Sequence, residues 1–439
     1  MDLVIAGNDN ESLVDQLSFK LPSTAQYGLE RRLVSSFPSG ASTFSPNGGL
    51  KVMRFVITGE HWMDASTLRL AFKVRNNGAQ SLQLASGPWC LFHQVRCLIG
   101  GTEIENLQYY GRTHELFRHL LMSNAWNVES TTEDFTTYAQ ANYPQVEPKQ
   151  IGPGQVASMN LTLCLGLLQM DKLLPLKFLG GMQIELTLAE PREAVMPGSP
   201  SNEFTIEQPK MQFSTVTLDS ALQNSFSSAL LQSRALQFHM RTIHLQQMAV
   251  AQGNTEIQLS LTRALSRLAG VFISFSGSNT YVDGLGNVQN TPANLTHLHK
   301  TFLNPSAFIT GQPADGTSSD ESLMQWSLQI GSKNWPESQP CSSLSETLSL
   351  LRQATGMIDG SVRTTSITEQ GYRNNQFVIG VPLQILRSAF SSINTRSGDL
   401  LSVFVRNLDP GIRGPGRVYV HMISEQIVEL RESGVTVMD

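Results

Sequence analysis

Short runs in which apolar and polar residues alternate recur along most of this chain, and they constrain its fold more than any other feature. A period of two places every second side chain on one face, which is the pattern of a half-buried β-strand. A first set of runs occupies 51–58, 67–74, 94–100, 159–168, 182–189 and 210–218. A second set occupies 236–250, 255–263, 270–277, 324–331, 376–383, 400–407 and 417–430. The sequence therefore predicts an all-β protein.

The two sets are separated by SALQNSFSSALLQS, 220–233, which has the pattern of a short helix. A chain of 439 residues is long enough for two cores, because all-β domains of roughly 200 to 250 residues are common. We therefore predict two β-domains in tandem. The predicted ranges are 1–45 for an N-terminal arm, 46–219 for the first domain, 220–234 for a linker helix, 235–432 for the second domain and 433–439 for a C-terminal tail.

The two sets share an order of landmarks, which indicates an internal repeat. In each half a strand ends in Ile-Gly, at 99–100 and at 330–331, and a polar stretch and then a helix pattern follow. The helix patterns are THELFRHLLM in the first half and SLSETLSLLRQA, 343–354, in the second. In the second, Ser343 and Glu346 have the spacing of a capping box.

Glycines continue the correspondence downstream. Gly166 and Gly380 each lie within a strand-like run, and Gly180-Gly181 and Gly398 each precede an alternating strand. A repeat of this length, far longer than a solenoid unit, predicts two copies of one sandwich.

The segment HELFRH, which ends at His119, resembles a zinc-protease motif with one extra residue. That motif needs histidines four apart, about 40° from each other around a helix, whereas His114 and His119 are five apart, or about 140°. We therefore favour a packing helix. On that interpretation Leu116, Leu120 and Leu121 face a sheet, His114 and His119 lie elsewhere on the surface, and Glu115 is solvated.

Other chemistry is weakly supported. The sequence contains no GxxxxGK[ST] loop and no GxSxG elbow. His297 and His299 lack a third ligand nearby, and His239 and His244 would face opposite sides of a strand. The carboxylates Glu103, Glu105 and Glu115 are close in sequence, but nothing assigns them a raised pKa. We predict no catalytic, cofactor-binding or metal-binding residues, and no enzyme.

The four cysteines are sparse and irregularly spaced, so they predict no disulfide framework. Cys90, Cys97 and Cys164 lie in or beside apolar runs and fit small buried residues, and Cys341 stands apart. The N-terminus lacks the basic start and apolar core of a secretory signal, so we expect synthesis inside the cell and chance occurrence of the sequons at Asn160 and Asn294. The longest apolar run, LTLCLGLLQM, is too short to span a membrane.

Charged residues make up only 15% of the chain, against about 25% in typical domains. A surface poor in charge suits extensive protein contacts, because removing a charge from water is costly. A serine- and threonine-rich sandwich without partners is the alternative. The net charge of −5 shows no basic footprint for nucleic acid.

Long polar connections lie at 123–156, 278–322 and 356–374. Each is longer than most loops of compact domains, so each is expected at the surface.

Several segments, taken in order, resemble the double jelly-roll major capsid proteins of the tailless-phage, adenovirus, virophage and Polinton-like virus lineage. They are FVITG (55–59), GGTEIENLQYY, LLPLKFLGGMQIELTL, LQIGSKNWP and INTRSGDLLSVFVRN, and the resemblance covers about 45–430. It implies two eight-stranded jelly rolls with short helices in the connections. It also implies a homotrimer that forms a pseudo-hexagonal capsomer of an icosahedral virion, with neighbouring capsomers and minor or penton proteins as partners. The loops 123–156 and 278–322 would be candidates for outward towers.

Three alternatives stay open beside this hypothesis. A minor or penton-type capsid component usually has a single jelly roll, which the repeat disfavours. A tandem β-sandwich could instead bind carbohydrate through Trp89, Trp126 or Trp335. A metal-dependent hydrolase is the least favoured.

Overall fold

The computed structural model describes most of the chain from residue 28 onward. The described residues are 28–121, 137–139, 146–148, 150–170, 172–196, 199–232, 234–251, 253–277, 280–282, 288–290, 302–306, 324–358, 367, 369–374, 376–386, 391–396, 400–410, 414–431 and 434–438. Most of the two predicted tower loops, 123–156 and 278–322, lies outside these residues, and so do Trp126, His297, His299 and Gly398.

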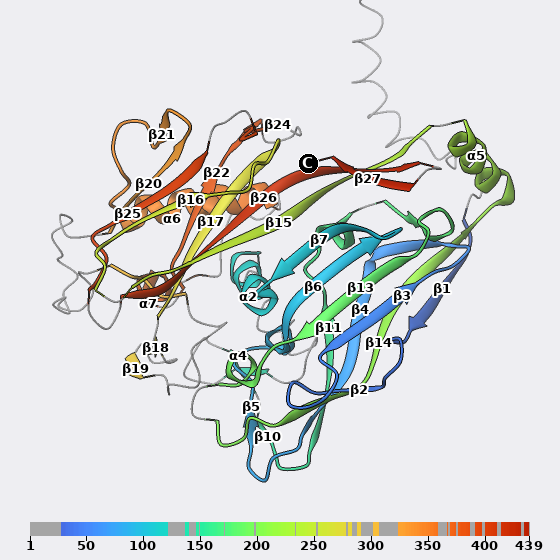
Figure 1. Ribbon diagram of the computed structural model, residues 1–439, viewed down its shortest axis with the longest axis horizontal. Helices are drawn as coiled ribbons and strands as arrows, with labels where there is room; N and C mark the ends of the chain where they lie inside the picture. Colours follow the sequence, from blue (N-terminus) through green and yellow to red (C-terminus); the bar gives the residue numbers. More distant parts are fainter. Residues whose placement is uncertain are drawn as a thin grey trace, which may run out of the picture.

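The first half of the chain folds into a sandwich of two antiparallel sheets (Figure 1). One sheet has the order β1-β14-β4-β11, with bounds Gly28–Ser36, Phe204–Leu218, Trp62–Asn76 and Val156–Thr162. The short strands β2 (Thr43–Phe44) and β12 (Leu174–Pro175) add to it. The facing sheet has the order β3-β13-β6-β7, with bounds Val52–Ile57, Met182–Leu188, Phe92–Ile99 and Thr102–Gln108.

The second half forms another sandwich of the same kind. One sheet has the order β15-β26-β17-β22, with bounds Leu236–Ala249, Pro415–Arg431, Leu268–Gly277 and Val378–Pro382, and β27 (Gly434–Met438) pairs with β26. The other has the order β16-β25-β20-β21, with bounds Glu256–Leu261, Leu401–Arg406, Gln325–Ile330 and Lys333–Trp335. The helix α5 (Ser220–Leu231) joins the two halves.

Strand order is the same in both sandwiches when the strands are counted along the chain. The equivalent pairs are β1 and β15, β3 and β16, β4 and β17, β6 and β20, β7 and β21, β11 and β22, β13 and β25, and β14 and β26. A helix follows the fifth strand of each set, α2 (Tyr110–Leu121) in the first and α6 (Leu344–Ile358) in the second. The predicted fold, two tandem eight-stranded jelly rolls, is confirmed.

Smaller elements complete the described chain. Three 3₁₀ turns, η1 (Pro88–Leu91), η2 (Gly166–Gln169) and η3 (Leu176–Phe178), and the helices α4 (Pro191–Ala194) and α7 (Glu369–Asn374) lie in connections. Short strand pairs are β5 (Leu82–Gln83) with β10 (Gln150–Ile151), β8 (Thr137–Ala139) with β9 (Val146–Pro148), β18 (Thr280–Val282) with β19 (Val288–Asn290), and β23 (Gln384–Leu386) with β24 (Ser391–Ser392). None of these helices within the described ranges is long and apolar enough to cross a membrane.

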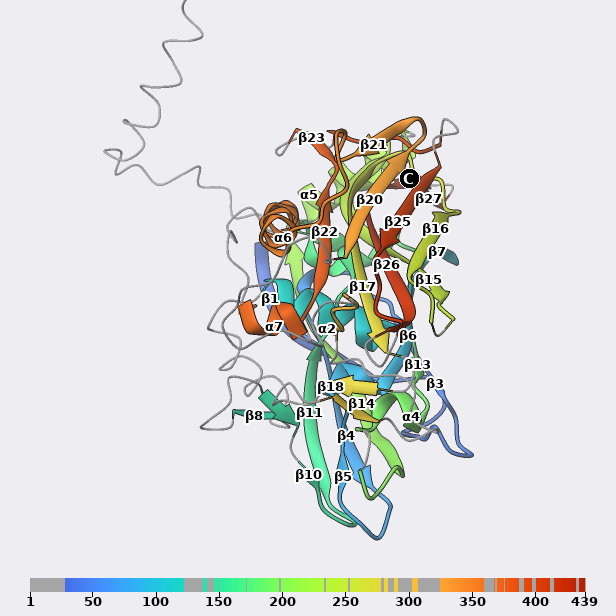
Figure 2. The same cartoon turned by 90° about the vertical axis from the view of Figure 1, so that its left-hand side faces the viewer.

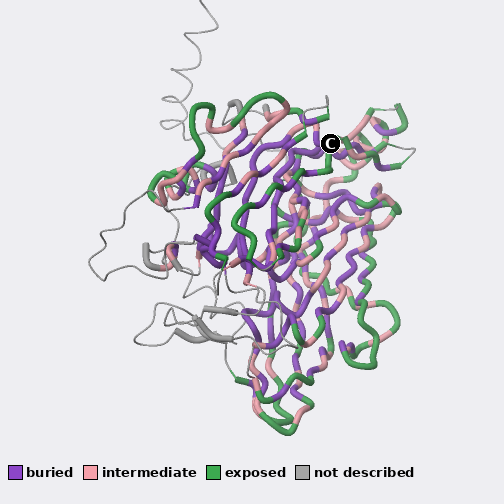
Figure 3. Tube along the Cα trace, turned by 60° about the vertical axis from the view of Figure 1, so that its left-hand side comes forward, coloured by how far each residue is buried: buried purple, intermediate pink, exposed green. Residues whose placement is uncertain are grey.

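The alternation in the sequence explains the burial. In β3 the residues are exposed and buried in turn, so its apolar face enters the core. By contrast, β17 is buried at every position from Leu268 to Ser276, which indicates cover on both faces of its sheet. Buried residues run through each sandwich and through the region where the two meet (Figure 3).

Equivalent glycine turns appear in both halves. Gly100 and Gly331 end equivalent strands, and both have positive φ, +55° and +59°, a conformation that favours glycine. Gly100 donates its N–H to the carbonyl of Gly181 at 3.0 Å, and Gly331 donates to that of Leu400 at 3.2 Å. The predicted Ile-Gly landmark therefore marks the same turn twice, and the polar stretch after it forms β7 and β21.

Two further details differ from the expectations. Gly166 does not lie within a strand: it begins the 3₁₀ turn η2, whereas Gly380 lies inside β22. In addition, β1 and β2 lie in the range predicted as an arm, and β27 in the range predicted as a tail, yet all three pair with sheet strands.

Candidate functional site at the junction of the sandwiches

The helix α2 lies where the two sandwiches meet (Figure 2). Leu116, Phe117 and Leu120 are buried and belong to the core cluster of the second sandwich, not the first. The ring of Phe117 packs edge-on against Phe272 of β17, with centroids 5.7 Å apart. The prediction that Leu116 and Leu120 face a sheet is confirmed, although that sheet belongs to the other half of the chain.

The placement predicted for the polar residues of this helix is wrong. Glu115 and His119 are only 3% and 6% exposed. His119 Nε2 lies 3.1 Å from Glu115 Oε1, and the Trp89 indole N–H donates to the other carboxylate oxygen. The guanidinium of Arg118 lies 4.0 Å from the centre of the Trp89 ring. A helix buried between two domains must find partners for its polar groups within the protein, and Glu115 finds them in Trp89 and His119.

Burial and bonding act oppositely on the Glu115 carboxyl. Burial would raise its pKa, but the hydrogen bond and charge of His119, with the charge of Arg118 and the Trp89 N–H, lower it to about 2. The group is therefore a carboxylate at neutral pH. Since it is enclosed by its partners, it acts as a structural anion of the junction.

His114 has a separate environment. Its ring stacks on Trp89 at 4.7 Å, and its Nε2 lies 3.1 Å from the carbonyl oxygen of Thr162, to which it donates. Burial, together with the charge of Arg118, lowers its pKa to about 4. His114 and His119 thus contact different partners. No group of three metal-ligating side chains occurs among the described residues, and the absence of a metal site stays a prediction.

Arg112 fixes the beginning of α2 to the second sandwich. Its guanidinium donates to the carbonyl oxygen of Phe275 at 2.9 Å and to Ser274 Oγ at 3.3 Å. It also lies 4.6 Å and 4.4 Å from the ring centres of Phe302 and Tyr419. Burial lowers its pKa to about 10, so it stays charged. A planar cation held by carbonyl and aromatic partners orients the helix.

The next residue, Thr113, contacts the longest strand of the second sandwich. Its Oγ1 lies 3.1 Å from Nε2 of His421 in β26. Burial, and then the charge of Arg112, lowers the pKa of His421 to about 3. The imidazole is therefore neutral at physiological pH.

A second contact brings the turn η2 against β15. A Cβ on Gly166 would lie 1.6 Å from the carbonyl oxygen of Arg241, so only glycine fits there. Glu105 accepts the N–H groups of Gly166 and Leu167 at 2.9 and 3.0 Å. Burial raises the pKa of Glu105 more than these bonds lower it. Sequence alone did not reveal this site, because the carboxylate and the glycine are 61 positions apart.

β27 also returns to the first sandwich. Val435 belongs to the core cluster of the first sandwich, and Thr102 Oγ1 donates to its carbonyl oxygen at 3.4 Å. The turn at Gly100 lies beside the Val435 side chain. The two sandwiches are therefore joined by α2, by η2 and by β27.

The other sequence candidates are dispersed. His239 is exposed, whereas His244 is buried against Ser424 Oγ at 3.0 Å, with its pKa lowered to about 3 by burial and by Arg263. Glu103 pairs with Arg96 at 2.8 Å. All four cysteines are free, with Cys164 partly exposed and Cys90, Cys97 and Cys341 buried.

The carbohydrate hypothesis loses one of its three residues. Trp89 is 2% exposed and packed in the junction, so it cannot stack on a sugar. Trp335 is half-buried and stacks on Trp326, with ring centroids 5.8 Å apart.

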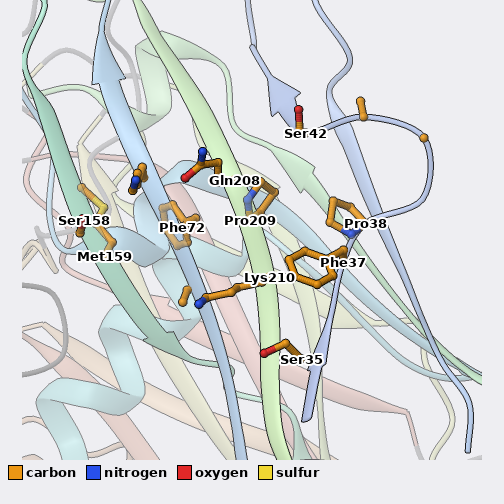
Figure 4. A pocket seen from close by; sticks show the side chains of 14 residues that line it. Ser35, Phe37, Pro38, Ser42, Phe72, Ser158, Met159, Gln208, Pro209 and Lys210 are labelled. Carbon is orange, nitrogen blue, oxygen red and sulfur yellow. The ribbon is translucent and has the colours of Figure 1, made fainter.

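A groove lies on the first sandwich, on the sheet that contains β4 and β14 (Figure 4). It has a volume of about 900 Å³. The chain leaves the sheet after β1, and the register of β14 against β4 shifts between Glu207 and Lys210, so the sheet is irregular here. Phe37 and Pro38 line one side, and Lys210 reaches across toward β4. No polar cluster converges in it.

No protein-family model matches the chain, and no curated protein matches its sequence. Many solved structures are similar to it in fold, among them the following three. The PBCV-1 virus capsid aligns at TM-score 0.62 and 11% identity, over 96% of this chain and 99% of that chain. The Faustovirus major capsid protein aligns at TM-score 0.59 and 6% identity, over 94% and 93%. A Sputnik virophage chain aligns at TM-score 0.57 and 10% identity, over 96% and 90%. The chain has the double jelly-roll fold of these capsid structures along nearly its whole length.

Proposed function

We propose that this protein is a structural major capsid protein, located in the virion, that assembles into pseudo-hexagonal capsomers of an icosahedral shell. The observation that carries this proposal is the repeated strand order of the two sandwiches. The likeness in fold to three viral capsid structures supports it. The function requires no catalyst and no cofactor.

The geometry explains how such a chain would work. A closed ring of three copies places six similar sandwiches around one axis, which imitates sixfold symmetry. The imitation needs a fixed angle between the two sandwiches of each chain. The buried contacts of α2, η2 and β27 would hold that angle, since they pack and hydrogen-bond across the junction. Neighbouring capsomers and minor or penton proteins would be the further partners, without sequence-specific contact to nucleic acid.

The test is the mass of the purified protein in solution. Light scattering at micromolar concentration should give three times the chain mass of 48.3 kDa, or larger shells. Electron micrographs should show particles with a hexagonal outline. A stable monomer under these conditions would contradict the proposal.

A further inference from the structure

Exposed apolar side chains are concentrated on one side of the first sandwich. Of the eleven large apolar residues that are exposed in the described part of the chain, seven lie between residues 29 and 56. We define the β1–β3 patch as the members of this group that lie on β1, on the residue after β1 or on β3: Leu29, Leu33, Val34, Phe37, Val52 and Val56. Leu33 and Phe37 are 70% and 67% exposed. Such a patch on a folded protein marks an interaction site.

The two strands of the patch are adjacent edges. Ser36 Oγ at the end of β1 donates to the carbonyl oxygen of Val56 in β3 at 3.2 Å, and Pro38 bridges to Phe55. Each strand stands at the end of its sheet, with β14 and β13 as its inner neighbours. In Figure 1 they form the side of the first sandwich that faces away from the second.

The equivalent strands of the second sandwich differ. Val52, Arg54 and Val56 occupy the exposed positions of β3, whereas the exposed positions of β16 carry Glu256, Gln258 and Ser260. The strand registers show which positions are equivalent. Ile57 pairs with the first residue of β13, Met182, and Leu261 pairs with the first residue of β25, Leu401. Val56 and Ser260, which precede them, are therefore equivalent.

The other strand of that edge, β15, is covered within the chain. Its carbonyl at Arg241 lies against Gly166, Lys172 Nζ donates to the carbonyl of Gln237 at 3.3 Å, and Gln247 Nε2 donates to the Tyr109 hydroxyl at 2.7 Å. All three partners belong to the first sandwich. Within the chain, the β15 side of the second sandwich therefore contacts the β7 side of the first sandwich.

The surfaces left over are the β1 side of the first sandwich and the β21 side of the second. In the first sandwich, the turn at Gly100 and Gly181 is covered by Val435 of β27. At the equivalent turn, where Gly331 donates to the carbonyl of Leu400, the Leu400 side chain is 58% exposed. The β1 side therefore exposes several apolar side chains, and the β21 side exposes Leu400 at its turn.

We infer that the β1–β3 patch of one copy packs against the β21 side of the second sandwich of the next copy, at the turn that carries Leu400. This inference rests on the proposed function and names its subunit contact. The contact repeats, between chains, the one that joins the sandwiches within a chain. It joins unlike surfaces, and such a head-to-tail contact closes into a ring when the rotation allows it.

The first experiment compares Val56→Asp with Ser260→Asp, its matched control at the equivalent position of β16. A charge in an apolar interface is costly, so Val56→Asp should shift the mass from trimer to monomer at micromolar concentration, while Ser260→Asp stays trimeric. Circular dichroism spectra of both variants should match that of the wild type, which shows that the fold is kept, although the monomeric variant loses the stability that assembly adds to the folded state. A folded Val56→Asp protein that remains a trimer would overturn the inference but leave the proposed function intact. A monomeric wild type would defeat both.

The second experiment tests whether the contact is head-to-tail. Leu400→Asp should also be monomeric, because it damages the opposite surface. Mixed with Val56→Asp, it still offers an intact patch to an intact Leu400 turn, so the mixture should sediment as a pair of chains. A mixture that remains monomeric would overturn the pairing of these two surfaces.

Discussion

The helices α2 and α6 occupy the same place in the order of strands but have different partners. α6 packs on β22 of its own sandwich, where a Cβ on Gly380 would lie 2.7 Å from Leu351 Cδ1. α2 instead packs on β17 and β26 of the other sandwich, through Phe117 and Thr113. The comparison shows that a repeated fold can use one of its two equivalent helices to fix the relative position of its halves.

The burial of the two helices reflects this difference. α2 carries buried charged residues in Arg112, Glu115 and Arg118, whereas α6 exposes Glu346 and Arg352. Charges on α2 are tolerated because each has partners in the junction. If this comparison is correct, substitutions at the junction should be far more costly than matched substitutions in the second sandwich.

The largest effect is expected for Gly166→Ala, because its Cβ would overlap the backbone carbonyl of Arg241. We expect a loss of about 3 to 5 kcal/mol in the free energy of unfolding, from overpacking against an element that cannot move aside. Gly380→Ala should cost less, about 1 to 3 kcal/mol, since its nearest neighbour is the end of a leucine side chain. Urea unfolding measures both. As a control, Gly59→Ala places its Cβ at an ordinary contact distance, 3.5 Å from Leu176 Cδ1, and should be neutral. Equal losses at 166 and 380 would contradict the comparison.

Glu115→Gln should have the next largest effect. It removes the anion from a buried cluster and leaves Arg118 and His119 without their carboxylate, which costs about 3 kcal/mol. Glu346→Gln on the exposed side of α6 is the matched control and should change stability by less than about 0.5 kcal/mol. The unfolding midpoints of the two variants measure this difference. A loss of stability in Glu115→Gln as small as that in Glu346→Gln would show that the cluster adds little to the stability of the junction.

Acid should weaken the protein through its buried histidines. The pKa of His421 falls to about 3 and that of His114 to about 4 in the folded state, against about 6.5 when unfolded. Between these values only the unfolded state binds the proton. Stability is therefore complete above pH 6.5 and is lost as the pH falls toward 4, by up to about 1.4 kcal/mol per pH unit for each histidine.

The contribution of His421 to this pH dependence can be isolated with His421→Gln. Glutamine keeps a polar partner for Thr113 and does not titrate, so the variant should show a shallower decline in unfolding free energy between pH 6.5 and 4.5. His239→Gln, at an exposed position of β15, serves as the control for the replacement itself. If the unfolding free energy of His421→Gln falls with pH as steeply as that of the wild type, His421 does not contribute to the pH dependence.

The smallest effect is expected at the surface of the second sandwich. Glu256 lies 3.9 Å from Arg406, and both side chains are mostly exposed. Exposed pairs contribute little, so Glu256→Gln should leave the unfolding midpoint unchanged within about 0.5 kcal/mol. A clear loss would mean that this edge carries more of the fold than its exposure indicates.

The sequence predicted the strands and the repeat well, because alternation and turn glycines are local signals. The Ile-Gly landmarks marked the same turn in both halves. β1 was missed, although it pairs with β14 along its length, because its residues are exposed and lack an alternating apolar face.

The junction could be predicted only in part. The spacing of Leu116 and Leu120 identified an apolar helix face, but spacing does not say which sandwich that face contacts. In the sequence Glu115 and His119 look like surface residues. Their burial depends on tertiary packing, which brings Trp89 from another segment against Glu115. The contact between Gly166 and Arg241 had no local signal at all.

The division of partners between the two halves has a consequence for synthesis. All strands of the first sandwich lie before residue 219, so they can pair as soon as that part of the chain has left the ribosome. The surface that receives Leu116, Phe117 and Leu120 is completed by β26, which is made near the end of synthesis. We therefore expect a nascent chain in which the first sandwich is folded while the apolar face of α2 is still exposed. A chaperone that binds exposed apolar surfaces would recognise this helix until the second sandwich is complete.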